Sequence, residues 1–247
     1  MTATTAIPGL ESNPRPPVTG PLEIPPAPPG HAFRWRRVLK LLRDVRTADD
    51  QVAAGLALFD AVGGMDSERT FQRFVRHPEG RRMLRTLPDL VDRLGDRKAL
   101  AAMPEGSLGR AYLEFAEKNG FAADGLVQKN REVKREVDSI DPYRRWFWDR
   151  FSVAHDLWHV LTGCPTSPEG ESELLWFSYG HNPGRGMLVL VGLVTYSSGT
   201  DLRRHRIHYR AWRAGRRAEN LLLARWEDFL EWPLDEVRAC FRVPELV

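Results

Sequence analysis

The sequence has few cysteines and no long apolar run. Only two of its 247 residues are cysteines, Cys164 and Cys240, and they do not form a Cys-x-x-Cys pair. Two isolated thiols are too few for a disulfide framework and exclude a cysteine-based zinc site. The longest uncharged stretch spans 15 residues, 186–200, whereas a membrane-spanning helix needs about 20 apolar residues. The sequence therefore predicts a reducing compartment and no membrane-spanning segment.

The sequence also lacks a strong charge bias and a recognisable targeting signal. Its 36 basic and 33 acidic residues leave a net charge of +3, and no nucleic-acid-binding module accompanies the arginines, so we predict no nucleic-acid partner. Residues 1–30 lack the segments of a secretory signal and contain acids, which argues against a mitochondrial presequence. The predicted location is the bacterial cytoplasm, with peripheral contact at the inner face of the membrane as an option.

Proline is concentrated at the start of the chain. Nine of the 18 prolines lie between residues 8 and 29, where they remove backbone donors and favour extended conformations. Residues 1–30 are therefore predicted to form a Pro-rich arm that is disordered or draped over the surface. Residues 31–247 are predicted to form one domain, because their length and composition match an ordinary globular protein.

Almost nothing in residues 31–247 alternates with the period of two that marks a strand. Apolar residues recur instead at helical spacing, which predicts an all-α fold: a single compact multi-helix domain. Glycines and prolines separate the expected helices. Two of these helices begin near residues 34 and 53, and the others span residues 67–76, 78–85, 107–119, 142–162, 169–179, 187–194, 201–223 and 235–241.

Two histidines and an aspartate stand at helical spacing between Phe151 and Gly163. His155 and His159 are four residues apart, so a helix places both imidazoles on one face. Asp156 is three residues before His159. It can act as a third metal ligand or as an acceptor that fixes a histidine tautomer.

A short turn follows and brings further carboxylates. The histidine helix must end near Gly163, and Ser167, an N-cap residue followed by a proline, begins the next helix. We expect Glu171, in the first turns of that helix, to face the two histidines. Glu169 and Glu173 are its local competitors.

Two imidazoles with carboxylates suit zinc, ferrous iron or manganese better than calcium or copper(I), and the absence of thiolates leaves positions open for water or substrate. The simplest alternative is a pair of exposed or hydrogen-bonded core histidines. The pattern is also similar to the zinc-peptidase pattern H-E-x-x-H, with Asp156 in place of the glutamate base. A phosphohydrolase of HD type would need a further histidine and aspartate, which the sequence does not reveal.

Three linked segments resemble one known family. His155-Asp156-Leu-Trp-His159, eleven residues and Glu171 match an H-D-x-x-H-(x11)-E signature, Met103–Phe115 matches PEGSLG-x-x-Y-x-x-F, and an LTG-x-PT turn follows the histidines. These segments are similar to those of the ubiquinone (coenzyme Q) biosynthesis family that is fourth in the COQ series, in its bacterial form. The resemblance covers roughly residues 65–245.

The resemblance implies a chemistry and a set of partners. His155, Asp156, His159 and Glu171 become the ligands of a divalent metal, zinc first, with iron or manganese as alternatives. The implied enzyme is a carbon–carbon lyase that carries out oxidative decarboxylation at ring carbon 1 of a polyprenylated hydroxybenzoate. The alternative is a non-catalytic lipid-binding scaffold that organises a ubiquinone-biosynthesis complex. The expected partners are the polyprenylated aromatic substrate, other ubiquinone-biosynthesis proteins and a membrane surface, with a homodimer as an option.

Two further segments have two interpretations each. Residues 203–217 contain seven arginines and no acid, which indicates either a solvated helix face or a surface that meets an anionic membrane. The apolar segment Met187–Val194 predicts either one wall of a lipid groove or a buried core helix.

Overall fold

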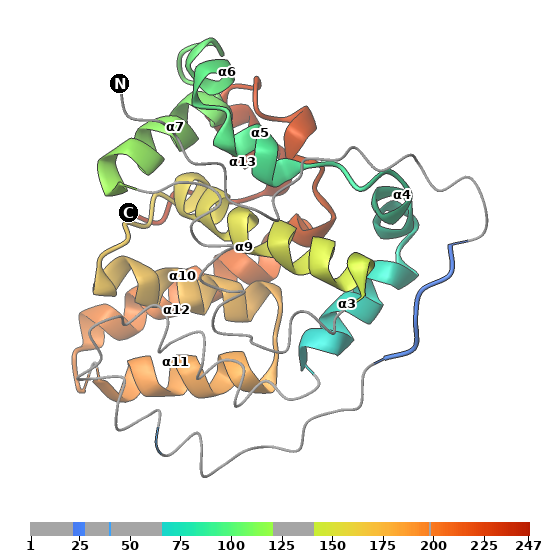
Figure 1. Cartoon of the computed structure of the whole chain (residues 1–247). Helices are drawn as coiled ribbons and strands as arrows, with labels where there is room; N and C mark the ends of the chain where they lie inside the picture. Colours follow the sequence, from blue (N-terminus) through green and yellow to red (C-terminus); the bar gives the residue numbers. More distant parts are fainter. Residues whose placement is uncertain (1–21, 28–39, 41–65, 121–140, 198) are drawn as a thin grey trace.

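The computed structural model describes residues 22–27, 40, 66–120, 141–197 and 199–247 (Figure 1). Within these residues the prediction of an all-α fold is confirmed, because they contain no strand and only one isolated bridge, between Ser107 and Pro233. The α-helices are α3 (Asp66–Arg76), α4 (Pro78–Thr86), α5 (Leu90–Gly95), α6 (Arg97–Ala101), α7 (Leu108–Asn119), α9 (Pro142–Thr162), α10 (Pro168–His181), α11 (Arg185–Ser197), α12 (Leu202–Arg217) and α13 (Leu234–Phe241). Two 3₁₀ turns, η2 (Leu221–Leu223) and η3 (Trp226–Asp228), precede α13.

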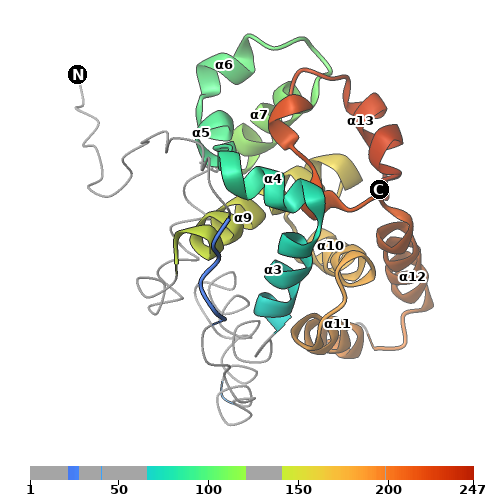
Figure 2. The ribbon, with the colours of Figure 1, turned by 90° about the vertical axis from the view of Figure 1, so that its right-hand side faces the viewer.

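Helix α9 is the central element. Figure 1 shows it crossing the middle of the molecule, with α5, α6, α7 and α13 on one side and α10, α12 and α11 on the other; Figure 2 gives the same arrangement from the side. Its buried side chains include Val153, Leu157, Trp158 and Leu161, each at most 1% exposed. A helix buried on several sides in this way holds its side chains in fixed positions.

Local sequence signals determine both ends of α9. The carboxylate of Asp141 accepts hydrogen bonds from the backbone N–H groups of Tyr143 and Arg144, and a proline occupies the first helical position. At the other end Gly163 has a φ of 74°, a left-handed conformation that favours glycine. The Arg238 side chain, from α13, donates to the carbonyl of Leu161 at 2.8 Å.

Several predicted boundaries need correction. The sequence did not predict α5 and α6, which have six and five residues. The helix predicted over residues 201–223 ends at Arg217, because the Glu219 N–H donates to the carbonyl of Phe241 at 2.9 Å and Asn220 then caps a separate 3₁₀ turn. The helices predicted near residues 34 and 53 lie outside the described residues, apart from residue 40.

Part of the predicted Pro-rich arm can be described. Residues 22–27 have no regular secondary structure, and Leu22 and Ile24 pack against a hydrophobic cluster formed by Phe71, Phe74, Met83, Leu84 and Phe147. The Arg144 guanidinium donates to the carbonyl of Pro25 at 3.1 Å. These six residues are therefore draped over the fold, one of the two conformations predicted for the arm, and the rest of residues 1–30 lies outside the described part.

Helix α11 lies at the surface. Val191 is buried, but Leu188 is 53% exposed and Tyr196 is 84% exposed. The prediction that this segment forms a buried core helix is therefore wrong. Among the described residues, no helix has the length and apolar character required to cross a membrane.

Candidate metal centre

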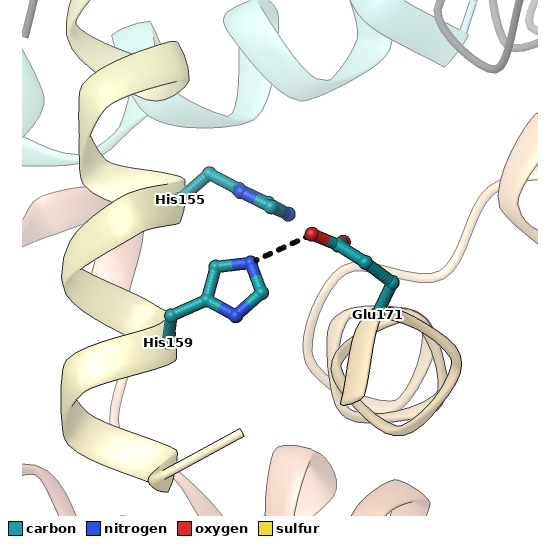
Figure 3. Close-up of side chains that lie close together, drawn as sticks. All are labelled: His155, His159 and Glu171. Carbon is teal, nitrogen blue, oxygen red and sulfur yellow. Dashed lines mark ion pairs between the residues drawn. The ribbon is translucent and has the colours of Figure 1, made fainter. Parts of the chain in front are cut away.

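The structure brings three of the four predicted ligands together. His155 and His159 lie one turn apart on α9, and Glu171 approaches them from the first turns of α10 (Figure 3). One ligand atom from each residue lies within 4.8 Å of the others. Nε2 of His159 is 3.3 Å from Oε1 of Glu171, and the two imidazole centroids are 4.9 Å apart.

The turn between α9 and α10 explains why Glu171 reaches the histidines. After Gly163, the Ser167 hydroxyl accepts a hydrogen bond from the N–H of Gly170 at 3.3 Å, and Pro168 opens α10. Gly170 is packed so closely against Pro165 that a Cβ atom would lie 2.1 Å from its carbonyl oxygen. This contact allows α10 to start close to the end of α9.

The two competing glutamates face elsewhere. Glu169 pairs with Arg204 of α12 at 3.0 Å. Glu173 Oε2 lies 3.9 Å from the Cys164 thiol, and burial raises the pKa of that thiol to about 11, which keeps it protonated at neutral pH. Of the three glutamates, Glu171 is thus the one that the structure places with the histidines.

His159 is held in one orientation by neighbours from two other segments. Its Nδ1 lies 2.9 Å from the carbonyl oxygen of Cys164, so Nδ1 must carry the proton and donate it. The Phe115 ring, from α7, stacks on the imidazole with centroids 5.5 Å apart and an interplanar angle of 22°. Nε2 therefore points its lone pair toward Glu171.

This donor set fits a cation. With Nδ1 protonated, Nε2 of His159 and Oε1 of Glu171 are both acceptors, and two acceptors 3.3 Å apart need a positive species between them. A proton on Nε2 can fill that role, and so can a divalent metal. Imidazole nitrogens with one carboxylate are the ligands that zinc, iron and manganese bind at sites that also accept water or substrate.

Electrostatic interactions within the site favour the protonated form of His155 and the ionised form of Glu171. Burial lowers the pKa of His155, but the neighbouring Asp156 carboxylate and the charge of Glu171 outweigh burial and raise that pKa above its ordinary value. Burial raises the pKa of Glu171, but the contact with His159 and the charges of both histidines outweigh burial and lower that pKa below its usual value. The carboxylate is thus ready to bind a cation.

Asp156 takes a different place from the other three predicted ligands. It is 5% exposed, and its Oδ1 lies 3.9 Å from Nδ1 of His155, away from the group formed by His155, His159 and Glu171. A carboxylate beside the far nitrogen of a histidine orients the ring and increases its basicity. The geometry matches the supporting role that the sequence left open for Asp156.

One side of the site remains accessible. The side chain of His159 is 1% exposed, whereas those of His155 and Glu171 are 31% and 41% exposed. A small molecule can therefore reach the two outer groups while the inner histidine stays fixed.

Sequence reasoning gave no role to Phe115 or to the carbonyl of Cys164. Both belong to segments that carried the family resemblance: Phe115 ends the PEGSLG-x-x-Y-x-x-F segment, and Cys164 lies in the LTG-x-PT turn. The structure places both against His159. The three segments that matched separately in the sequence thus converge on one histidine.

Comparison with known proteins identifies the family. The profile described as "Coenzyme Q (ubiquinone) biosynthesis protein Coq4" matches residues 46–246. The chain belongs to the Coq4 family. The Yarrowia lipolytica protein named "Ubiquinone biosynthesis protein COQ4, mitochondrial" is 32% identical over 171 residues, which cover 68% of this chain and 62% of that protein. The Culex quinquefasciatus protein named "Ubiquinone biosynthesis protein COQ4 homolog 1, mitochondrial" is 31% identical over 68% of this chain and 59% of its own length.

The matched segment thus spans less than two thirds of these Coq4 relatives. A crystal structure from Nostoc punctiforme, provisionally named as a ubiquinone biosynthesis protein, superposes with a TM-score of 0.57 at 18% identity, covering 85% of this chain and 98% of that one. This likeness supports the fold. The family assignment favours the ubiquinone-related prediction over the peptidase and phosphohydrolase alternatives.

The predicted location in the bacterial cytoplasm is wrong by this comparison, since the Coq4 relatives are named as mitochondrial proteins. That prediction depended on the missing secretory signal and the acids of residues 1–30, and on the small number of cysteines. Those residues precede the segment that matches the family and so carry no weight against the comparison.

Proposed function

We propose that this Coq4-family protein takes part in ubiquinone biosynthesis as a metal-dependent carbon–carbon lyase. The observation that supports the proposal is the approach of Glu171 on α10 to His155 and His159 on α9, within 4.8 Å. His155, His159 and Glu171 would hold the metal, and Asp156 would orient His155. Zinc is the first candidate, and iron and manganese are the alternatives.

The proposed reaction is oxidative decarboxylation at ring carbon 1 of a polyprenylated hydroxybenzoate. The bond between that carbon and the carboxyl group breaks and carbon dioxide leaves. A hydroxyl group from water takes its place, and two electrons and two protons pass to dioxygen, which becomes hydrogen peroxide. A bound divalent metal would supply Lewis-acid stabilisation of negative charge on the substrate oxygens.

The chain's own groups would hold the inner side of the site fixed and leave its outer side open to the substrate. Phe115 and the Cys164 carbonyl fix His159, so the inner wall of the site is rigid. The partly exposed side of the site, at His155 and Glu171, is where an aromatic carboxylate would enter. Contact with other ubiquinone-biosynthesis proteins, a membrane surface or a second copy of the chain remains a prediction.

A test of the enzyme proposal follows the substrate and product directly. The purified protein, loaded in turn with zinc, iron or manganese, would be incubated with a prenylated hydroxybenzoate and dioxygen, and the released carbon dioxide and hydroxylated product measured. We expect activity with the wild-type protein and loss of at least about a hundredfold in Glu171→Gln. The control Glu173→Gln should keep activity, because Glu173 faces Cys164. No turnover with any of the three metals would contradict the proposal.

A non-catalytic scaffold is the second candidate. Its supporting observation is the exposed apolar surface of α11 and the start of α12, where Leu188, Tyr196 and Leu202 are 53%, 84% and 71% exposed; such surfaces often bind lipids or proteins. In cells that lack the native gene, a folded, metal-free His159→Ala protein would restore ubiquinone if the protein were only a scaffold. An enzyme would fail to do so.

A further inference from the structure

A second group of charged residues lies on α3 and α4, remote from the metal centre along the chain. Arg76, Arg81, Arg82 and Arg85, together with Pro78, line a hollow of about 530 Å³, which is within the size range of small-molecule sites. Figure 2 shows the two helices following one another on the side of the molecule that faces the viewer. Three of the four arginines are exposed, and Arg85 is half-buried.

The acids of α3 are committed to other partners. The Glu68 carboxylate accepts hydrogen bonds from Arg144 at 2.7 and 2.8 Å. Asp66 accepts from the backbone N–H groups of Arg185 and Gly186 at the start of α11, and from Arg69. Neither carboxylate is therefore available to neutralise the arginines of the hollow.

Among the described residues that line the hollow, positive charge exceeds negative charge. Glu79 is paired with Arg82 at 3.6 Å, while Arg76 and Arg81 have no carboxylate partner among the described residues. The neighbouring Arg73, one turn before Arg76, donates to the neutral oxygens of Thr70 and Asn182. The adjoining cavity, of about 710 Å³, shares Arg76 and also includes Arg69 and Arg73 in its lining.

We propose that this hollow, the arginine hollow of α3 and α4, binds a phosphate-bearing ligand. Guanidinium groups offer planar pairs of N–H donors that match the oxygens of a phosphate group. Several guanidinium groups around one hollow favour an anion that carries more than one negative charge. Among the described residues that line the hollow, Pro78 is the one that is not an arginine. That composition favours an oxyanion over an apolar protein segment. The ligand is either a free phosphorylated compound or the headgroup of an anionic phospholipid.

Binding of inorganic pyrophosphate to the full chain tests the proposal. Calorimetry at low ionic strength would include a chelator, so that a metal at His155 and His159 cannot contribute. We expect about one pyrophosphate to bind per chain, with an affinity that falls as salt is added. The double variant Arg76→Gln/Arg81→Gln should lose affinity by roughly tenfold or more. The matched control, Arg93→Gln/Arg97→Gln, removes the same charge from exposed positions on α5 and α6 and should bind like the wild type.

Vesicles distinguish the two sources of the phosphate. The site would be assigned to lipid headgroups if the protein sediments with phosphatidylglycerol vesicles but not with phosphatidylcholine vesicles and binds pyrophosphate only weakly. This sedimentation should depend on Arg76 and Arg81 in the same way. Equal losses in both double variants would overturn the proposal, because net charge would then explain the binding. The proposal would also be overturned if the protein bound neither pyrophosphate nor phosphatidylglycerol vesicles, or if it bound a polyglutamate peptide more tightly than pyrophosphate.

Discussion

The Ser172 hydroxyl lies 2.7 Å from Nε2 of His208, and both side chains are buried. Ser172 immediately follows Glu171 on α10, whereas His208 belongs to α12. The ring of Trp176 stacks on His208 with centroids 5.7 Å apart. This contact fixes the first turns of α10, and with them the Glu171 carboxylate, relative to the rest of the domain.

Ser172→Ala should therefore weaken metal binding as well as stability. Loss of the hydrogen bond leaves a buried histidine nitrogen unpaired, which costs about 1–3 kcal/mol of unfolding free energy, and frees the turn that carries Glu171. Metal affinity should fall about tenfold, measured by competition with a chromogenic chelator. The control Ser178→Ala alters another buried serine of α10, farther from Glu171. An equal loss of affinity in both variants would contradict a positioning role for Ser172.

Gly163→Ala should destabilise the protein through the end of α9. The residue has a φ of 74°, and an added Cβ would lie 3.1 Å from the Glu245 side chain. We expect a loss of roughly 1–2 kcal/mol in urea unfolding. Gly192→Ala is the control, because it lies within α11 with no atom within 4 Å of the added Cβ and should raise stability by about 0.5–1 kcal/mol. A neutral Gly163→Ala would contradict the left-handed conformation.

The partly buried His181 should make stability depend on pH. Burial lowers the pKa of His181 to about 4 from 6.5, while its Nε2 accepts a hydrogen bond from the Leu221 N–H at 3.1 Å. Above pH 6.5 the residue is neutral in both states and contributes no pH dependence. As the pH falls from 6.5 toward 4, His181 binds a proton in the unfolded chain but not in the folded chain, which lowers the free energy of unfolding by roughly 3 kcal/mol. Urea unfolding of His181→Gln should show a smaller slope over this interval, and equal slopes would contradict a neutral His181.

The Arg144–Glu68 pair should show strong coupling. Their side chains are 3% and 10% exposed and 2.7 Å apart, so Arg144→Met leaves the buried Glu68 carboxylate without its cationic partner, which costs about 3–5 kcal/mol of unfolding free energy. Glu68→Leu should cost less, because Arg144 keeps its ion pair with Asp141 at 2.6 Å. The double variant should cost clearly less than the sum of the two. For comparison, Glu117→Ala in the exposed pair with Arg97 should cost less than about 1 kcal/mol. Additive losses at Arg144 and Glu68 would refute the coupling.

Local signals made much of the fold predictable. Helix α9 was predicted with its observed boundaries, because Asp141, Pro142 and Gly163 supply both caps within the sequence. Helices α5 and α6 were missed since six and five residues are too few to show a helical period. The end of α12 was missed because no glycine or proline marks it. Its termination depends on the carbonyl of Phe241, which is distant in sequence.

The same distinction applies to the site. Spacing placed His155 and His159 on one face, and the turn signals at Gly163 and Ser167 indicated that Glu171 could approach them. The sequence could not decide whether Asp156 faces the centre or supports His155, because both directions are compatible with its spacing. Nor could it reveal that Phe115 packs on His159, since this contact depends on how α7 and α9 pack.

Metal content tests the proposed centre most directly. Elemental analysis would compare the purified wild-type protein with His159→Ala and Glu171→Gln after reconstitution with zinc, iron or manganese, and circular dichroism would verify that each variant is folded. We expect about one metal ion per wild-type chain and strongly reduced metal in both folded variants. A wild-type protein that binds none of the three metals, or variants that retain full metal content, would contradict the assignment of His155, His159 and Glu171 as a metal centre.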